Sequence, residues 1–228
     1  METVLSQRLR QVAAYVPQGA KLLDVGSDHA YLPIALLEEG KISSAIAGEV
    51  VKGPFESAQK NVAASGFEEK IEVRLANGLA AFEPSDQVTA ISICGMGGRL
   101  IADILEAGKE KLTSVDRLIL QPNNREDDLR RWLVANGFAI IAEEIMTENG
   151  KFYEILVAEA GQAELTADQE RFGPFLMTDL SDIFRLKWER EWNKLDIALA
   201  QVPLSNEESR SALIQKMEKI KEVLANES

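Results

Sequence analysis

The chain has 228 residues, of which 46% are hydrophobic and 27% are charged, and its formal net charge is −12. The length suits one medium-sized domain with an appended segment, and the composition excludes a low-complexity or disordered chain. The acidic balance argues against wholesale electrostatic attraction to nucleic acid, although it leaves room for a local basic face.

Cysteine use and hydropathy narrow the class of protein further. Cys94 is the only cysteine, which excludes an intramolecular disulfide framework and a cysteine-rich zinc cluster. The first ten residues lack the apolar core of a signal peptide, and no apolar run is long enough to span a membrane. We therefore expect a cytoplasmic protein without a membrane segment or a metal site.

The first part of the chain alternates helices and strands. Apolar residues at spacings of three and four predict a helix over 3–16, which Pro17 and Gly19 end. Strands are predicted over 21–26, 44–49 and 70–75, with helices over 31–39 and 54–65 between them. Because strand 21–26 is apolar on both faces, we expect it at the centre of a parallel sheet.

The middle of the chain continues this alternation and then changes it. We predict a strand over 89–94, a helix over 100–107, a strand over 115–121 and a helix over 125–136. Strands 138–145 and 152–158 follow each other directly, and Asn149-Gly150 between them predicts a hairpin. The expected architecture is therefore an α/β fold whose seven-stranded, mostly parallel sheet ends in a hairpin. That pattern is typical of Rossmann-like class I S-adenosylmethionine-dependent methyltransferases, whereas a dinucleotide dehydrogenase more often continues as a second βαβ half.

The sequence after Gly161 carries no strand signal. Apolar residues recur at spacings of three and four from Leu176 to Leu199, Pro203 breaks the run, and Ser205 is a candidate cap for a second helix. These patterns predict an antiparallel coiled-coil hairpin of two helices. We divide the chain into a donor-binding methyltransferase domain over 1–161 and a helical hairpin over 162–228.

The stretch from Lys21 to Glu49 predicts a nucleotide-sized ligand site at the carboxyl edge of the sheet. Gly26 ends the first strand, where a missing side chain lets the backbone approach a ligand closely. Asp24 is placed to face the ammonium of the ligand's amino-acid part through backbone and water, and Glu49 to hold ribose hydroxyls. The alternatives are a tight structural turn and, at Glu49, a solvated acid.

Two further loops at the same edge are candidates for ligand contact. Asn77-Gly78 suits an adenine edge, because an amide both donates and accepts hydrogen bonds, although the pair is also a common turn dipeptide. Gly95-Met96-Gly97-Gly98 keeps the floor of the site open and presents backbone groups at the start of a helix. Amino-group methyltransferases carry an Asn/Asp-Pro-Pro-aromatic clamp at this place, and this chain does not.

The other residues that could carry chemistry can each be explained by a structural role instead. His29, the only histidine, lies in the turn beside Asp28, which balances a role in the site against a structural one. We interpret Cys94 as a small hydrophobe, and Trp188 and Trp192 as packing residues rather than base-stacking ones. Two groups of cations are the best local basic surfaces, and each alone is more often a solvated face: Arg125, Arg130 and Arg131, and Lys187, Arg190 and Lys194.

Several motifs together resemble the bacterial TrmK family, whose members are tRNA (adenine, N1)-methyltransferases acting on adenine 22. The motifs are residues 24–33 (Asp-Val-Gly-Ser-Asp-His-Ala-Tyr-Leu-Pro), Gly53-Pro54, Asn77-Gly78-Leu79, residues 95–98 and residues 120–123 (Leu-Gln-Pro-Asn). The resemblance covers nearly the whole chain, including residues 5–9 and the helical hairpin. The family pattern after the third strand is Asp-Gly-Leu, and here Asn77 replaces the acid.

The resemblance implies a donor site for S-adenosylmethionine, with S-adenosylhomocysteine as the product, and tRNA as the partner. The residues expected to bind the donor are Arg8, Asp24, Gly26, Ser27, Asp28, His29, Tyr31, Leu32, Gly48, Glu49, Val50, Asn77, Gly78, Leu79 and Gly95. Those expected to shape the catalytic pocket for the base are Asp28, His29, Gly95, Met96 and Gly97. We expect Arg8 to steer either the carboxylate of the donor or a phosphate.

The implied chemistry makes modest demands on the protein. Adenine N1 is a neutral lone-pair nucleophile, so catalysis rests on positioning and water exclusion rather than on a strong general base. Because N1 lies on the Watson–Crick edge, the base must be unpaired or flipped. We expect the helical hairpin and the helix over 125–136 to contribute to tRNA docking, and self-association through the hairpin is possible.

Three alternative functions remain at this stage. An oxidoreductase using a nicotinamide cofactor predicts a second glycine two places after Gly26 and no terminal hairpin, so Asp28 and the Asn149-Gly150 turn argue against it. The second is a tRNA- or protein-binding scaffold with a vestigial pocket. The third is methyl transfer to a small molecule, a protein or another substrate.

Overall fold

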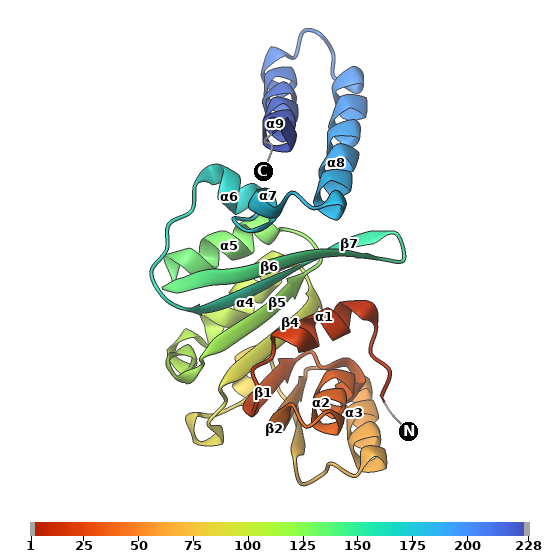
Figure 1. Cartoon of the computed structure of the whole chain (residues 1–228), viewed down its shortest axis with the longest axis vertical. Helices are drawn as coiled ribbons and strands as arrows, with labels where there is room; N and C mark the ends of the chain where they lie inside the picture. The colour runs from red at the N-terminus through yellow and green to blue at the C-terminus, as the bar shows by residue number, and fades with distance from the viewer. Residues whose placement is uncertain (1–2, 226–228) are drawn as a thin grey trace.

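A seven-stranded sheet forms the centre of the molecule in the computed structural model, which describes residues 3–225 (Figure 1). Its strand order is β3-β2-β1-β4-β5-β7-β6. The first five strands are parallel, and β7 is antiparallel to both β5 and β6, as the sequence predicts. The strands are β1 (Ala20–Val25), β2 (Ile42–Glu49), β3 (Ile71–Leu75), β4 (Ala90–Met96), β5 (Arg117–Pro122), β6 (Phe138–Glu148) and β7 (Lys151–Ala160).

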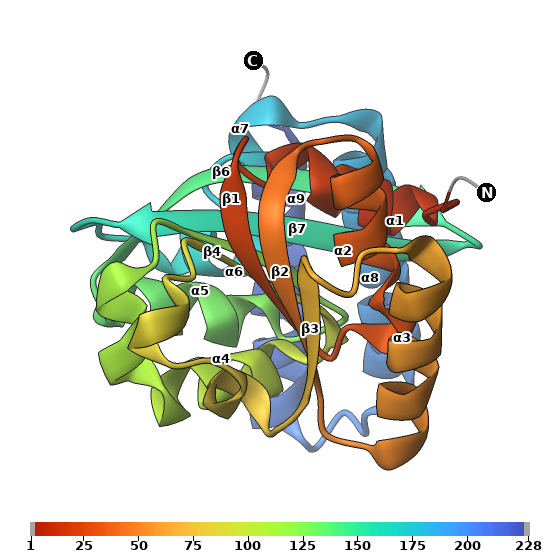
Figure 2. The ribbon, with the colours of Figure 1, turned by 90° about the horizontal axis from the view of Figure 1, so that it is seen from below.

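Helices cover both faces of this sheet (Figure 2). On one face lie α1 (Gln7–Tyr15), α2 (Tyr31–Glu38) and α3 (Lys52–Ser65). On the other lie α4 (Gly98–Ala107) and α5 (Glu126–Ala135). This three-layer arrangement buries the strands on both sides, which explains why β1 and β5 read as continuous apolar runs.

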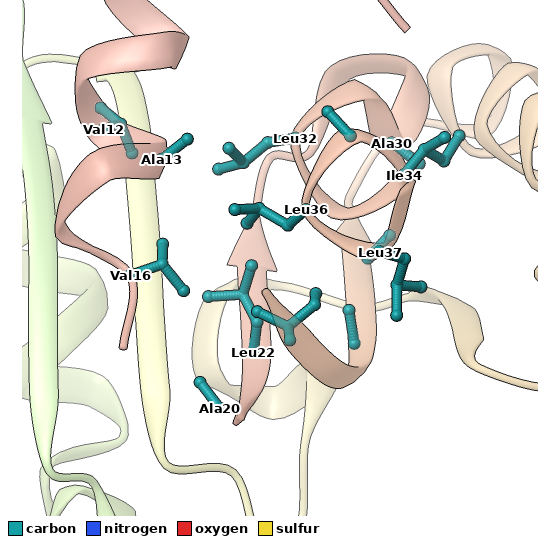
Figure 3. Packing of buried hydrophobic residues seen from close by; sticks show 14 of the residues in the cluster. Val12, Ala13, Val16, Ala20, Leu22, Ala30, Leu32, Ile34, Leu36 and Leu37 are labelled. Carbon is teal, nitrogen blue, oxygen red and sulfur yellow. The ribbon is translucent and has the colours of Figure 1, made fainter. Parts of the chain in front are cut away.

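The layer on the first face is held by aliphatic packing between α1, α2 and β1 (Figure 3). The side chains that meet here are all at most 2% exposed: Val12 of α1, Val16 just after it, Leu32 and Leu36 of α2, and Leu22 of β1. Each such side chain contributes about 1.5–3 kcal/mol when fully buried. This packing fixes α1 against the sheet, and with it Arg8 at the first turn of the helix.

The structure confirms each strand and helix predicted up to residue 160 and moves some boundaries. The helix predicted over 54–65 begins at Lys52, and the helix predicted over 100–107 begins at Gly98. Strand β4 runs on to Met96 instead of ending at Cys94, because the pairing with β5 resumes after an irregularity between Cys94 and Met96. Gly95 and Met96 therefore belong to the end of a strand rather than to a free loop.

The C-terminal segment contains four helices as far as residue 225, where the sequence analysis expected two. They are α6 (Ala167–Phe172), α7 (Leu176–Asp179), α8 (Asp182–Gln201) and α9 (Glu207–Ala225). The apolar run from Leu176 to Leu199 is not one helix, because Leu180 adopts a left-handed backbone with φ +48° and Ser181 caps α8. The predicted cap at Ser205 is also wrong: the side chain of Asn206 accepts a hydrogen bond from the Ser209 backbone instead.

Helices α8 and α9 form a hairpin that projects from the sheet beyond β6 and β7 (Figure 1). A buried charge cluster joins α8 to the strands. Arg130 of α5 donates to Glu143 of β6 at 2.7 Å and to Glu154 of β7 at 2.5 Å, and Lys187 of α8 donates to Glu154 at 2.5 Å. The expectation that Arg130 belongs to a basic surface is therefore wrong.

The tryptophans of α8 pack as expected. Trp188 is buried, with its ring 4.4 Å from that of Phe172 between centroids, and Trp192 is partly buried in the same cluster. This cluster also contains Ile145 of β6, so the helical segment shares a core with the sheet. The domain boundary near residue 161 and the coiled-coil character of the hairpin stay predictions.

Candidate functional site

A cavity of about 370 Å³ opens at the carboxyl edge of the parallel strands. Its walls come from the loop after β1, the end of β4, the first turn of α1, the loop after β5, and β7. The residues around it are Arg8, Leu9, Asp24, Gly26, Ser27, Asp28, Leu32, Cys94, Gly95, Met96, Asn123 and Tyr153. We call it the donor cavity, and its volume lies in the range of small-ligand sites.

Asp24 is the buried anion of the donor cavity. It lies opposite Ser92 in the β1–β4 register, and the hydroxyls of Ser92 and Ser27 each donate to one of its carboxylate oxygens at 2.6 Å. Burial raises the pKa of Asp24 to about 6, although both hydroxyl bonds oppose that rise. A carboxylate held in this way gains from a cationic ligand group that enters the cavity.

The turn after Asp24 exposes backbone to the cavity. Gly26 has φ +67°, and a β-carbon at this position would collide with the Met96 methyl group. The backbone N–H groups of Gly26 and Ser27 both donate to the Gly48 carbonyl, at 2.9 and 3.2 Å. Gly26 is therefore required by its backbone conformation and by its close approach to Met96.

Three successive non-glycine residues follow in left-handed conformation. Asp28, His29 and Ala30 have φ of 37°, 70° and 59°. The Asp28 N–H donates to the Glu49 carboxylate at 2.6 Å, and the Asn61 amide donates to the His29 carbonyl at 2.9 Å. Such backbone costs about 1–3 kcal/mol per residue and persists only where its surroundings hold it in place.

A polar chain fixes the opposite wall of the donor cavity. Gln121 is fully buried, and its side-chain oxygen accepts from Arg8 at 2.5 Å and from the Gly95 N–H at 3.0 Å. Asn123 donates to the Gly95 carbonyl at 2.7 Å, and the Arg8 guanidinium lies 5.5 Å from the Tyr153 ring centroid. Helix α1, the end of β4 and strand β7 are thus tied together around the cavity.

The structure brings together some of the predicted site residues. Seven of the predicted donor-site residues, together with Met96, line the donor cavity: Arg8, Asp24, Gly26, Ser27, Asp28, Leu32 and Gly95. The rings of His29 and Tyr31 stack at 5.3 Å between centroids, are partly exposed, and do not belong to the lining. Gly97 packs against Asn124 instead.

The residues predicted to hold the ribose and adenine lie apart from that cavity. Glu49 is buried behind the turn, where burial raises its pKa, although the Asp28 N–H bond opposes the rise. Val50 is exposed. Asn77, Gly78 and Leu79 border a separate hollow against α4. Contact of these residues with a donor stays a prediction.

Sequence reasoning missed several residues of the donor cavity. Gln121 and Asn123 appear in the family motif but received no role, and a buried glutamine ending the apolar run of β5 was the available signal. Tyr153 gave no signal, because an aromatic residue in a strand is unremarkable. Cys94 borders the cavity as a half-buried thiol, and burial raises its pKa, in agreement with its interpretation as a small hydrophobe.

A second, larger cavity of about 990 Å³ lies between the sheet and α8. It is bounded by residues 123–127 at the start of α5, by the β6–β7 turn and the beginning of β7, and by residues of α6, α8 and α9. We call it the cleft. Asn123 and Tyr153 border both the cleft and the donor cavity, so the two spaces meet at these side chains.

The cations of the cleft differ from the predicted ones. Lys187 is wrong as a free cation, because it pairs with Glu126 at 3.0 Å and Glu154 at 2.5 Å. Arg125 pairs with Asp128 at 2.6 Å. Three exposed cations that line the cleft form none of the ion pairs found among residues 3–225: Lys151, Arg190 and Lys216.

Within residues 3–225 no helix has the length and apolar character needed to cross a membrane. The same part of the chain holds no group of three or more histidine, cysteine, aspartate or glutamate side chains arranged to bind a metal ion.

Comparison with known proteins places this geometry in context. A family model described as TrmK, tRNA (adenine(22)-N(1))-methyltransferase, matches residues 22–224. The curated tRNA (adenine(22)-N(1))-methyltransferase of Bacillus subtilis is 43% identical, over 98% of both chains. A Streptococcus pneumoniae protein is 64% identical with a TM-score of 0.96, over 97% of this chain and 100% of that one. Its complex with S-adenosyl-L-methionine matches at 62% identity and a TM-score of 0.92, with the same coverage.

Proposed function

The chain belongs to the TrmK family of tRNA (adenine(22)-N(1))-methyltransferases, and from this premise we propose how its own residues bind the donor and the tRNA. It is an S-adenosylmethionine-dependent enzyme that methylates N1 of an adenine in tRNA. The observation that carries the residue-level proposal is the placement of a buried carboxylate, Asp24, and a half-buried guanidinium, Arg8, in one cavity.

The donor cavity fits the amino-acid part of S-adenosylmethionine. That part carries an ammonium and a carboxylate, and the cavity offers the buried carboxylate of Asp24, the exposed carboxylate of Asp28 and the guanidinium of Arg8. Asp24 stays unsatisfied as an anion, because its two serine partners donate hydrogen bonds but supply no positive charge. Asp24 then faces the ammonium, and Arg8 faces the carboxylate, while the open backbone at Gly26 and Gly95 admits the ligand closely.

The rest of the donor extends along the carboxyl ends of β2 and β3. Glu49 lies at the end of β2, where a strand-end acid reaches ribose hydroxyls, and one of its oxygens is engaged by Asp28. Val50 and Asn77 flank this edge as the places for the adenine ring. The Glu49–Asp28 bond couples the ribose position to the left-handed turn, so the turn and the donor are positioned by the same carboxylate.

The chain's contribution to chemistry is positioning. When bound, S-adenosylmethionine supplies a methyl group on a sulfonium sulfur, so an N–C bond to adenine N1 forms as the S–C bond breaks. N1 is a neutral nucleophile with a free lone pair, so no side chain has to remove a proton before attack. The wall that aligns the base is formed by Asp28, Gly95 and Met96. The hydrogen bond between Arg8 and Gln121 closes this wall and excludes water.

The tRNA docks in the cleft between the sheet and α8. Lys151, Arg190 and Lys216 provide exposed positive charge on three different elements around this cleft. The Arg190 guanidinium lies 5.8 Å from the Phe152 ring centroid, so a cation that can bind a tRNA phosphate lies beside an aromatic ring. A local basic cleft reconciles tRNA binding with a net charge of −12. Self-association through the hairpin and a cytoplasmic location stay predictions.

The test separates this proposal from its rivals. Calorimetric titration with S-adenosylmethionine distinguishes the enzyme from a scaffold with a vestigial pocket, which binds no donor. Incubation with labelled donor and unmodified tRNA transcript, followed by digestion, identifies the methylated nucleoside. Label in N1-methyladenosine supports the proposal. Donor binding without label in tRNA refutes the tRNA assignment and favours another methyl acceptor.

A further inference from the structure

The donor cavity and the cleft meet at two side chains, and only one of these is aromatic. Asn123 and Tyr153 border both spaces. Among the described residues that line the donor cavity, Tyr153 contributes the only aromatic ring. His29 and Tyr31, the rings that the sequence favoured, do not belong to that lining. A base that leaves the tRNA in the cleft and reaches the donor therefore passes Tyr153.

We propose that Tyr153 is a substrate-binding residue that stacks the target adenine at the junction of the cleft and the donor cavity. The inference rests on the proposed function. An adenine that exposes its N1 edge loses both its pairing and its neighbours in the stack, and an aromatic ring at the entry replaces the lost stacking. The proposal identifies Tyr153 as the ring that performs this role.

The surroundings of Tyr153 hold its ring in one place. The residue lies in β7, opposite Met146 of β6, and is therefore fixed by the ladder rather than by a loop. Arg8 lies 5.5 Å from the ring centroid and is itself held by Gln121, which also binds the Gly95 N–H. Arg8 and Gln121 thus link the ring to the backbone of Gly95 at the end of β4.

Asn123 complements the ring on the other side of the junction. Its side-chain N–H donates to the Gly95 carbonyl at 2.7 Å, and its side-chain oxygen accepts from Gln121 at 3.2 Å. These bonds fix the exposed amide beside the floor and leave one N–H and one lone pair for a ligand. An adenine carries a donor amino group and acceptor ring nitrogens, which an amide can match. Tyr153 then supplies stacking, and Asn123 supplies an edge contact.

The kinetic test compares Tyr153→Leu with Tyr153→Phe, and uses Phe175→Leu as a matched loss of an exposed ring that lies outside both cavities. Loss of one base–aromatic stack lowers kcat/KM for tRNA by about tenfold to a hundredfold in Tyr153→Leu. Tyr153→Phe keeps the ring and stays within about threefold of wild type. The dissociation constant for S-adenosylmethionine stays within about twofold in Tyr153→Phe, which keeps the ring beside Arg8.

A cross-linking test on the wild-type protein removes any dependence on the folding of a variant. A tRNA transcript with 8-azidoadenosine at the target position is irradiated with the enzyme, and the labelled peptide is identified by mass spectrometry. Label on the β7 peptide containing Tyr153 supports the inference, and label on the peptide containing Tyr31 overturns it.

The two failures can be told apart. If wild-type enzyme places no methyl group on adenine N1 of the transcript, the proposed function itself fails. If wild-type enzyme is active and Tyr153→Leu is as active as Phe175→Leu, the function stands and the role of Tyr153 is refuted. A parallel loss in the Leu and Phe variants of Tyr153 also refutes stacking, because the ring is present in one of them.

Discussion

We expect the replacement of Asp24 by asparagine to raise the stability of the fold and to weaken donor binding. The pKa of this carboxyl rises from 3.8 to about 6 in the folded protein, chiefly because burial disfavours its charge. The rise is roughly two pH units, and each unit corresponds to about 1.4 kcal/mol, so the ionised group costs the fold about 3 kcal/mol. Asparagine removes the charge and still pairs with the hydroxyls of Ser27 and Ser92.

The sign and the pH window follow from this raised pKa. The folded state binds the Asp24 proton more tightly than the unfolded chain, so the cost grows as the pH rises from about 4 to about 6 and is constant above that. Asp24→Asn is therefore more stable than wild type by about 3 kcal/mol at pH 8 and by roughly half of that at pH 5. Its affinity for S-adenosylmethionine falls about tenfold or more, because a charge-assisted contact is lost.

Urea unfolding at pH 5 and pH 8, followed by circular dichroism, measures the stability difference, and calorimetry at pH 8 measures donor affinity. Asp116→Asn, a change at the exposed acid just before β5, is the control for general loss of negative charge. A stability gain that is equal at the two pH values, or a loss at pH 8, contradicts the reasoning. Unchanged donor affinity removes Asp24 from the donor site.

Three further outcomes are expected. Gly26→Ala loses about 1–2 kcal/mol of stability from its positive φ, with weaker donor binding because the added methyl displaces Met96; thermal unfolding and calorimetry measure these effects. Arg130→Met leaves the buried Glu143 without a cation and Glu154 with Lys187 alone, and it lowers the free energy of unfolding by about 3–5 kcal/mol in urea; an unchanged midpoint refutes the buried network. Affinity for tRNA falls with salt, and Arg190→Ala reduces the slope of log affinity against log salt by about one; an unaltered slope in filter binding excludes Arg190 from phosphate contact.

The sheet was predictable because its signals are local. Apolar runs mark most of the parallel strands, alternation marks the strand over 70–75, and Asn149-Gly150 marks the terminal hairpin. The hydrophobic pattern does not record backbone conformation, so the break of the long helix at Leu180 and the cap at Asn206 were missed. A leucine in the left-handed backbone conformation is rare, and the neighbouring residues do not predict it.

The site was predictable where one chain segment builds it and not where distant segments meet. Asp24, Gly26 and Asp28 come from one turn, and the family motif identifies them. The wall formed by Gln121 and Tyr153 depends on how α1 packs on the sheet and on β7 pairing with β5, which no spacing in the sequence encodes. The same limit explains why Arg130 was wrongly assigned to a basic surface. The sequence does not reveal that Glu143 and Glu154 of other strands neutralise this arginine.

The measurement closest to the central claim is methyl transfer to two tRNA transcripts that differ only at the target adenine. Labelled S-adenosylmethionine is incubated with the enzyme and each transcript, and the digested nucleosides are separated. The account predicts label in N1-methyladenosine from the transcript with adenine at position 22, and none from the transcript with guanine there. Equal labelling of both transcripts, or label in any other nucleoside, contradicts it.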